Sequence, residues 1–130
     1  MDSSSTSTGI LLFAHGSRVE AANRGVHELA RQVAQAGAYP YVEACFLDIA
    51  QPDLKAAIEQ AAAGGIRRLI VIPFFLTMGV HLQRDLPRLV AAEQSRFPGL
   101  SIEVGESLEA HPRMAQMVLE RIQNALGDSN

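Results

Sequence analysis

The chain has 130 residues, of which 48% are hydrophobic, and a formal net charge of −3, which fits one folded globular domain and excludes a disordered protein. With 11 Lys and Arg against 14 Asp and Glu and no basic face apparent, the composition argues against nucleic acid as the main partner. The longest apolar run, residues 69–76, is too short to span a bilayer, so no membrane partner is expected. A single cysteine, Cys45, cannot form an internal disulfide, which favours a reducing cytoplasm.

The first part of the chain predicts a tail, a strand and a helix. Residues 1–8, MDSSSTST, are polar and lack the features of a signal peptide, so we expect a disordered tail followed by a single domain over residues 9–127. The continuous apolar run 10–14 is typical of a strand buried on both faces. Helical spacing follows as far as Gly37, and residues 41–46 predict a second strand.

The middle of the chain repeats this order. A second helix is expected to begin at residues 51–53, Gln-Pro-Asp, and to end at the glycine pair 64–65. Residues 69–75 form the most apolar of the predicted strands. Asp85 as a cap and Pro87 in the first turn predict the start of a third helix.

The last part of the chain predicts an edge strand and a fourth helix. The third helix is expected to stop at residues 97–99, and apolar and polar residues alternate over 100–104, which indicates a half-exposed edge strand. The final helix is expected to start at Pro112 and to end at Gly127. Its apolar stripe, interpreted as core filling, consists of Met114, Met117, Val118, Ile122 and Leu126.

Strand and helix therefore alternate four times along the chain. Such alternation is typical of an α/β fold, a doubly wound parallel sheet of four strands with helices on both faces and right-handed crossovers. The simplest strand order is 2-1-3-4, which places the carboxyl ends of the first and third strands side by side. In open parallel sheets ligands bind at this switch point.

Polar residues follow three of the strands at this edge. His15 follows the first strand, Asp48 the second, and His81 follows the third after the loop 76–80. Two imidazoles and a carboxylate match the ligands that divalent metals take in proteins. Each also has a structural alternative, since a histidine at a strand end can serve a turn and Asp48 could cap the second helix.

The turn after His15 is suited to anions. Gly16, Ser17 and Arg18 lie at a strand-to-helix turn, where backbone N–H groups point at the start of a helix and Arg18 adds charge. Neither G-x-x-x-x-G-K-[ST] nor G-x-G-x-x-G is present, which disfavours nucleotide binding. Of the other histidines, His27 is expected on the surface of the first helix and His111 in a turn or cap.

Four stretches of the chain resemble the short sirohydrochlorin chelatases of the CbiX type, which are class II chelatases: FAHGSR, CFLDIAQP, IPFFLTMGVHLQRDLP and LEAHP. The resemblance covers residues 9 to 126. It implies a parallel α/β sheet and insertion of a divalent metal, cobalt first and nickel or iron as alternatives, into sirohydrochlorin during cobalamin or siroheme biosynthesis. No cofactor is expected to stay bound, because the metal is a substrate.

The resemblance also assigns residues. The two metal-site histidines of the family match His15 and His81, which are therefore expected to be catalytic and metal-binding. Many members carry glutamate where this chain has Asp48, and the shorter acid favours a water-bridged or base-orienting role. LEAHP has Ala110 where a glycine is expected before His-Pro. The substrate-contacting loop of the family matches residues 76–80 of this chain. Together with the anion-binding turn after His15, this loop gives the expected substrate-binding residues: Gly16, Ser17, Arg18, Leu76, Thr77, Met78, Gly79 and Val80.

Imidazole suits this chemistry because it can hold a metal loosely and can take protons from pyrrole N–H groups. Larger class II chelatases cover the macrocycle with two lobes and this chain supplies one, so the resemblance implies a homodimer. A histidine phosphatase is disfavoured, because Ala14 stands where that pattern has arginine. A non-catalytic tetrapyrrole or metal carrier remains an alternative.

Overall fold

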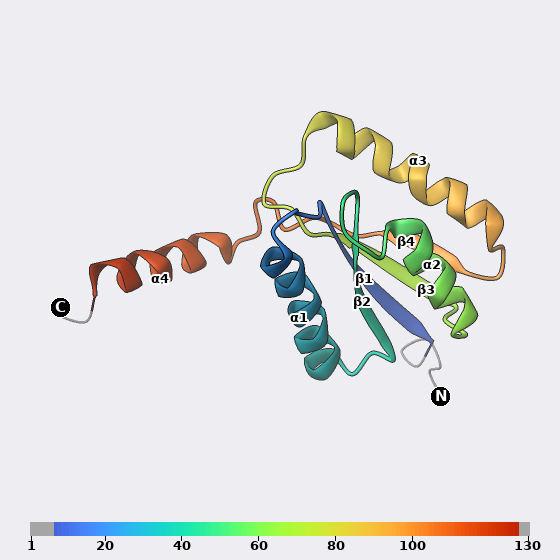
Figure 1. The fold of residues 1–130 in the computed structure, drawn as a ribbon, viewed down its shortest axis with the longest axis horizontal. Helices are drawn as coiled ribbons and strands as arrows, with labels where there is room; N and C mark the ends of the chain where they lie inside the picture. The colour runs from blue at the N-terminus through green and yellow to red at the C-terminus, as the bar shows by residue number, and fades with distance from the viewer. Residues whose placement is uncertain (1–6, 128–130) are drawn as a thin grey trace.

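The computed structural model describes residues 7–127, and within this range four strands and four helices alternate along the chain. The strands are β1 (Thr8–Ala14), β2 (Tyr41–Phe46), β3 (Arg68–Pro73) and β4 (Ser101–Val104). They form one parallel sheet in the order β2-β1-β3-β4 (Figure 1). The predicted fold class and strand order are confirmed.

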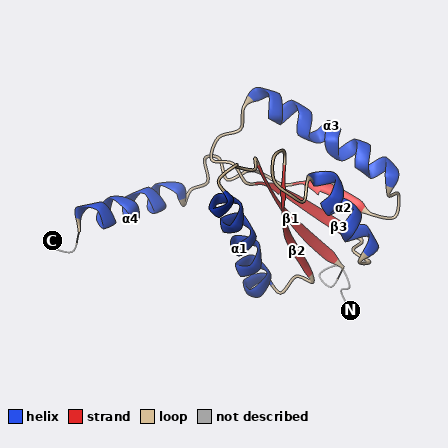
Figure 2. Ribbon diagram, in the orientation of Figure 1, coloured by secondary structure: helices blue, strands red, loops and turns tan. Residues whose placement is uncertain are grey.

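The helices differ in how they meet this sheet. They are α1 (Glu20–Gly37), α2 (Leu54–Ala63), α3 (Val80–Arg96) and α4 (Met114–Leu126). One face of the sheet packs against α1 and the other against α2 and α3, whereas α4 extends away from the sheet (Figure 2). No helix in the described part of the chain is long and apolar enough to cross a membrane.

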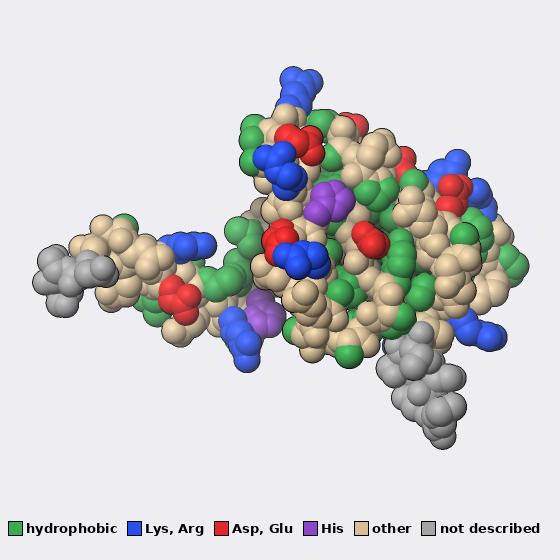
Figure 3. Space-filling view, turned by 60° about the horizontal axis from the view of Figure 1, so that its bottom comes forward, with side chains coloured by type: hydrophobic (Ala, Val, Ile, Leu, Met, Phe, Trp, Pro, Cys, Tyr) green, Lys and Arg blue, Asp and Glu red, His purple; other side chains and the backbone are tan. Residues whose placement is uncertain are grey.

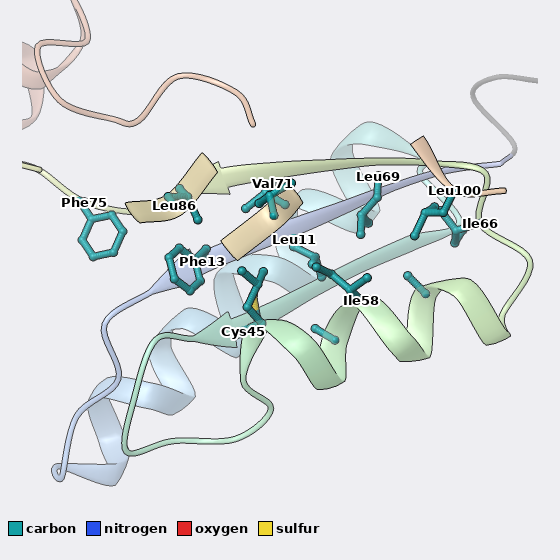
Figure 4. Close-up of a cluster of buried hydrophobic side chains, with 14 residues drawn as sticks. Leu11, Phe13, Cys45, Ile58, Ile66, Leu69, Val71, Phe75, Leu86 and Leu100 are labelled. Atoms are coloured by element: carbon teal, nitrogen blue, oxygen red, sulfur yellow. The ribbon is translucent and has the colours of Figure 1, made fainter. Parts of the chain in front are cut away.

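The sheet is built around β1, which lies between β2 and β3 and is buried along its whole length. Its side chains alternate between two cores, as the period of a strand requires. Leu11 and Phe13 point into the core beneath α2 and α3, and Ile10 and Leu12 point into the core beneath α1. Figure 4 shows the first core, with Phe13, Phe75 and Leu86 gathered at one end of it.

The ends of α2 agree with the local sequence. The carboxylate of Asp53 accepts a hydrogen bond from the backbone N–H of Ala56 at 2.8 Å and caps the first turn, and Gly64 caps the last turn. This confirms that the helix is opened by Gln-Pro-Asp and closed by the glycine pair. The cap fixes the connection that follows β2, which lies at the functional edge of the sheet.

The predicted start of α3 is wrong. The helix begins at Val80 after Gly79, and neither a cap at Asp85 nor a first turn at Pro87 is observed. A proline inside a helix removes one hydrogen bond and is costly. It is tolerated here because Leu86 and Val90 anchor the helix in the core while Pro87 faces solvent.

The predicted tail of residues 1–8 overlaps the domain at its last residue. Thr8 is buried in β1, and the carbonyl of Ser7 accepts hydrogen bonds from the backbone N–H groups of Arg67 and Arg68. Residues 1–6 lie outside the described residues. The first strand therefore starts two residues earlier than its apolar run indicates, because Thr8 and Gly9 pair with β3.

The interpretation of the α4 stripe as core filling is also wrong. Over its whole length, Met114–Leu126, no residue of α4 is buried. The pattern correctly predicts an amphipathic helix that is closed by Gly127, but no part of the described chain buries its apolar side. A periodic pattern shows that a helix has an apolar face and does not show what covers that face.

The thiol of Cys45 should be unreactive in the folded protein. The side chain is fully buried, and this burial, with a smaller contribution from Asp53, raises its pKa to about 12. The thiol is therefore almost fully protonated at neutral and mildly alkaline pH, and the reactive thiolate is scarce at pH 8. With Ellman's reagent at pH 8 we expect the native protein not to react. In urea we expect one reactive thiol. Fast labelling of the native protein would contradict the burial of Cys45.

Candidate functional site

The loops that follow β1 and β2 are joined by backbone hydrogen bonds beyond the ends of the strands. The N–H of Leu47 donates to the carbonyl of Ala14 at 2.8 Å, and the N–H of Asp48 donates to the carbonyl of His15 at 3.0 Å. These bonds continue the pairing of the two strands by one step. The backbone of His15 is therefore fixed although its side chain is exposed.

Gly16 makes this arrangement possible. Its φ is +92°, in the region that favours glycine, and a Cβ atom at this position would lie 1.9 Å from the carbonyl oxygen of Asp48. Both conditions exclude a side chain here. A glycine after His15 is therefore required by the contact between the two loops.

Asn23 fixes the next residue of the loop. Its side chain is buried, accepts the N–H of Ser17 at 2.9 Å and donates to the carbonyl of Ser17 at 2.8 Å. This role of Asn23 is not among the sequence-based predictions, although an asparagine on the apolar side of α1, one turn before Val26, is a signal of it. The expectation that this turn offers its N–H groups to anions needs correction at Ser17, because that N–H is already bound by Asn23.

The imidazole of His15 rests on an aromatic support. Its ring meets the ring of Phe75 edge-on, with centroids 4.6 Å apart and an interplanar angle of 83°. Phe75 is buried and in turn meets Phe13 at 6.0 Å and 75°. The orientation of the exposed imidazole is thus set by two rings that belong to the core.

His81 lies in the first turn of α3 and is exposed. Its Nδ1 atom lies 3.0 Å from Nη2 of Arg84. Because a guanidinium only donates, Nδ1 is the acceptor in this contact and the ring proton is on Nε2. A metal can bind this imidazole only after the contact with Arg84 opens, and Arg84 is exposed enough to move.

The two histidines line one groove of about 630 Å³ at the carboxyl edge of the sheet. His15 reaches it from the end of β1, and His81 reaches it from the first turn of α3, whereas the sequence placed His81 in the loop that follows β3. Figure 3 shows a histidine side chain beside hydrophobic and acidic side chains on the surface turned toward the viewer. Besides the histidines, the groove is lined by Leu47, Gly79, Leu82, Asp85, Arg88 and Leu89.

The third predicted ligand, Asp48, does not line this groove. Its carboxylate accepts the backbone N–H of Ile49 at 2.8 Å and so serves its own turn. Asp85, interpreted from the sequence as a helix cap, lines the groove one helical turn after His81. Within residues 7–127 no three or more His, Cys, Asp or Glu side chains are close enough to hold an ion together.

A second hollow, of about 390 Å³, lies on the α1 side of the same edge. His15 borders both hollows. Among the expected substrate-binding residues, Arg18 and Val80 are exposed and line neither hollow, and Met78 packs against the core. Gly79 lines the groove together with His81. The remaining expected substrate-binding residues line the second hollow: Gly16, Ser17, Leu76 and Thr77.

The other two histidines lie away from the groove. His27 is exposed on α1, with its ring 5.4 Å from that of Phe46. Nδ1 of His111 accepts the backbone N–H of Arg113 at 3.0 Å, which confirms the expected turn role. Ala110, which stands where a glycine was expected, adopts φ +61°.

The comparison with family models matches residues 9–125 to CbiX. Among curated proteins, the chain is 29% identical to the sirohydrochlorin cobaltochelatase of Methanopyrus kandleri, over 92% of this chain and 97% of that protein. It is 30% identical to the sirohydrochlorin cobaltochelatase of Methanosarcina barkeri, over 91% and 96%. It is 33% identical to the chloroplastic sirohydrochlorin ferrochelatase of Arabidopsis thaliana, over 91% of this chain and 52% of that protein.

Solved structures share the fold. A putative cobalamin biosynthesis CbiX protein from Marinobacter aquaeolei VT8 matches with a TM-score of 0.79 and 24% identity, over 92% of this chain and 97% of the other. The sirohydrochlorin chelatase SirB from Bacillus subtilis subspecies spizizenii, in complex with cobalt, matches with a TM-score of 0.83 and 24% identity. The match covers 92% of this chain and 51% of SirB, so the chain spans about half of that protein, as it does of the Arabidopsis one.

The loop contact at Gly16 can be tested by adding one methyl group. We expect Gly16→Ala to lower the free energy of unfolding by about 1–3 kcal/mol, because the new Cβ requires a strained φ and collides with the Asp48 carbonyl. Gly79→Ala is the control: its φ is −68° and no atom lies within 4 Å of the added Cβ, so its effect should stay within about 0.5 kcal/mol. Urea unfolding followed by circular dichroism measures both; equal effects would contradict the contact.

Proposed function

The chain belongs to the CbiX family and is a metal chelatase, and from this premise we propose that it inserts a divalent metal into sirohydrochlorin. The observation that carries the proposal is the position of two imidazoles, His15 and His81, on one groove at the switch point of the sheet. Cobalt(II) is the proposed metal, with iron(II) or nickel(II) as alternatives, because similar proteins are named for cobalt and for iron. Imidazole accepts all three ions.

We assign the role of general base to His15. Metal insertion requires that pyrrole nitrogens lose their protons, and a positioned imidazole can accept them. The hydrogen-bonded loop and the ring of Phe75 hold His15 in one orientation, which is what a base needs.

We assign metal delivery to His81, assisted by Asp85. Two ligands from one helix face leave the remaining coordination positions open, so the ion can be handed to the macrocycle. Arg84, which contacts both His81 and Asp85, connects this step with substrate binding. When a carboxylate of the substrate draws Arg84 away, Nδ1 of His81 is released and the ring can rearrange its proton to bind the metal.

The groove also suits the macrocycle itself. Sirohydrochlorin combines a flat ring with many carboxylates. The apolar side chains Leu47, Leu82 and Leu89 can contact the ring face, and Arg84 and Arg88 can pair with carboxylates. Binding of an acidic substrate then needs no excess of basic residues in the whole chain.

We further propose that the working unit is a homodimer in a reducing cytoplasm. The groove is open to solvent, and ligand sites usually bury about 70–90% of a small ligand, so a second copy is needed to cover the other face of the macrocycle. A buried, unpaired Cys45 fits a reducing compartment.

The proposal is tested by an anaerobic insertion assay with each metal in turn, read from the absorbance of the tetrapyrrole. We expect His15→Ala to lower the rate by about 100- to 10,000-fold, because a positioned base is lost. His81→Ala should also be severely impaired, with the larger loss in metal affinity. Multiple turnovers by the unmodified protein separate an enzyme from a stoichiometric carrier.

The other two histidines supply controls for this assay. His27→Ala and His111→Ala change exposed imidazoles away from the groove and should keep most of the activity. Circular dichroism confirms that each variant folds. A folded His15→Ala variant with the unmodified rate, or an inactive His111→Ala variant, would refute the assignment.

The two aspartates make a second matched pair. We expect Asp85→Asn to weaken metal affinity and rate by about 10- to 100-fold, because its carboxylate lines the groove beside His81. Asp48→Asn should change both by less than this, because that side chain serves its own turn outside the groove. Steady-state rates at varied cobalt(II) concentration measure the effect; a larger loss for Asp48→Asn would restore it as the metal-site acid.

A further inference from the structure

The only lysine of the chain lies in a hollow that adjoins the histidine groove. Lys55 is the second residue of α2 and is exposed. It lines a third hollow, of about 190 Å³, between the start of α2 and the second half of α3, which we call the lysine hollow. Both helices cover the same face of the sheet (Figure 2). Leu47 and Leu89 line this hollow and also the groove that holds His15 and His81, so the two spaces are neighbours.

The length of α3 between the two spaces suits a large flat ligand. Leu89 follows His81 by eight residues, which places it about 12 Å farther along the helix axis. With bonds of about 1.3–1.5 Å, the carboxylate of a propionate arm lies about 8–10 Å from the centre of a tetrapyrrole. A lysine side chain spans about 6 Å from its Cα atom to its ammonium group. A macrocycle that is centred at the histidines and lies along α3 therefore brings an outer carboxylate to the border of the lysine hollow.

The acidic neighbours of Lys55 are already engaged by other groups. The carboxylate of Asp53 accepts the N–H of Ala56 at 2.8 Å, and the carboxylate of Glu93 accepts a hydrogen bond from Nη1 of Arg96 at 2.7 Å. In the described part of the chain, no hydrogen bond or ion pair involves the ammonium group of Lys55. A free cation beside apolar walls suits an anionic group that is carried by an apolar body.

We propose that Lys55 is a substrate-binding residue whose ammonium group pairs with an outer carboxylate of the tetrapyrrole while the histidines act at its centre. The inference rests on the proposed function and deepens it, since it names a contact at the far end of the same substrate. Arg88 lines the groove one residue before Leu89, so the two cations lie on either side of the shared apolar wall. Because the contact is remote from the pyrrole nitrogens, Lys55 contributes to binding and orientation of the macrocycle and not to the chemical step.

Steady-state metal insertion at varied sirohydrochlorin concentration tests this contact. Lys55→Met keeps an unbranched side chain and removes the charge. We expect it to raise KM for sirohydrochlorin by about 5- to 20-fold and to leave kcat nearly unchanged, because the lost pair is the same in the ground state and the transition state. Lys55→Arg should recover most of the affinity, since the cation is restored.

Arg67→Met is the matched control. Arg67 is an exposed cation directly before β3, at the amino edge of the sheet and away from the groove, so this change removes the same charge elsewhere. It should leave KM unchanged, and circular dichroism verifies the fold of each variant. Equal losses in Lys55→Met and Arg67→Met would overturn the contact, because net charge alone would then explain them. A loss that Lys55→Arg does not recover would overturn it as well.

Titration with metal-free sirohydrochlorin, followed by its fluorescence under anaerobic conditions, separates this inference from the proposed function. We expect the dissociation constant to rise in Lys55→Met by the same factor as KM. An unmodified protein that binds with this dependence on Lys55 but never turns over overturns the chelatase and leaves the contact standing. An active chelatase whose KM and dissociation constant are unchanged in Lys55→Met overturns the contact alone. An unmodified protein that does not bind sirohydrochlorin overturns both.

Because Lys55 is the only lysine, an amine reagent tests the contact without any substitution. Acetylation with an N-hydroxysuccinimide ester at pH 8, read by peptide mass spectrometry, measures how fast Lys55 reacts. Sirohydrochlorin should slow this reaction in proportion to the fraction of protein that is bound. Citrate, a tricarboxylate without a ring, should give no protection at the same concentration. Unchanged reactivity with sirohydrochlorin bound, or equal protection by citrate, would overturn the assignment.

Discussion

Where the β1–α1 and β2–α2 loops meet, the carbonyl oxygen of Asp48 occupies the space that a side chain at position 16 would need. The same two loops share a hydrogen bond from the Asp48 N–H to the His15 carbonyl, so the backbone of the residue that follows β1 is held by the neighbouring loop. Asn23 then secures Ser17 from within α1. This backbone contact fixes the position of the exposed His15 imidazole. The imidazole in turn forms part of the wall of the groove.

The parts that could be predicted from sequence are those that depend on burial and on strand order. β1 is buried throughout, and such a strand can only be central in a parallel sheet flanked by helices. Once the order 2-1-3-4 is adopted as the simplest doubly wound order, the ends of β1 and β3 must be neighbours. His15 and His81 were expected on one groove for this reason, and no side-chain detail was needed.

The parts that could not be predicted depend on which partner a residue finds. Asp85 and Pro87 match a helix start, yet α3 begins five residues before Asp85, because the packing of Leu86 and Val90 outweighs one lost hydrogen bond. Asp48 and Asp85 are both polar residues near the edge of the sheet, and only the three-dimensional arrangement shows which carboxylate faces the groove. The periodicity of α4 likewise describes the helix and leaves the covering surface open.

Phe75 belongs to two parts of the molecule at once. One contact of its ring lies in the core, with Phe13, and the other lies at the groove, with His15. The stability of the domain and the orientation of the imidazole therefore depend on the same side chain. At many core positions one aliphatic side chain can replace another at small cost, but an aliphatic replacement of Phe75 that the core tolerates would still remove the ring on which the His15 imidazole rests.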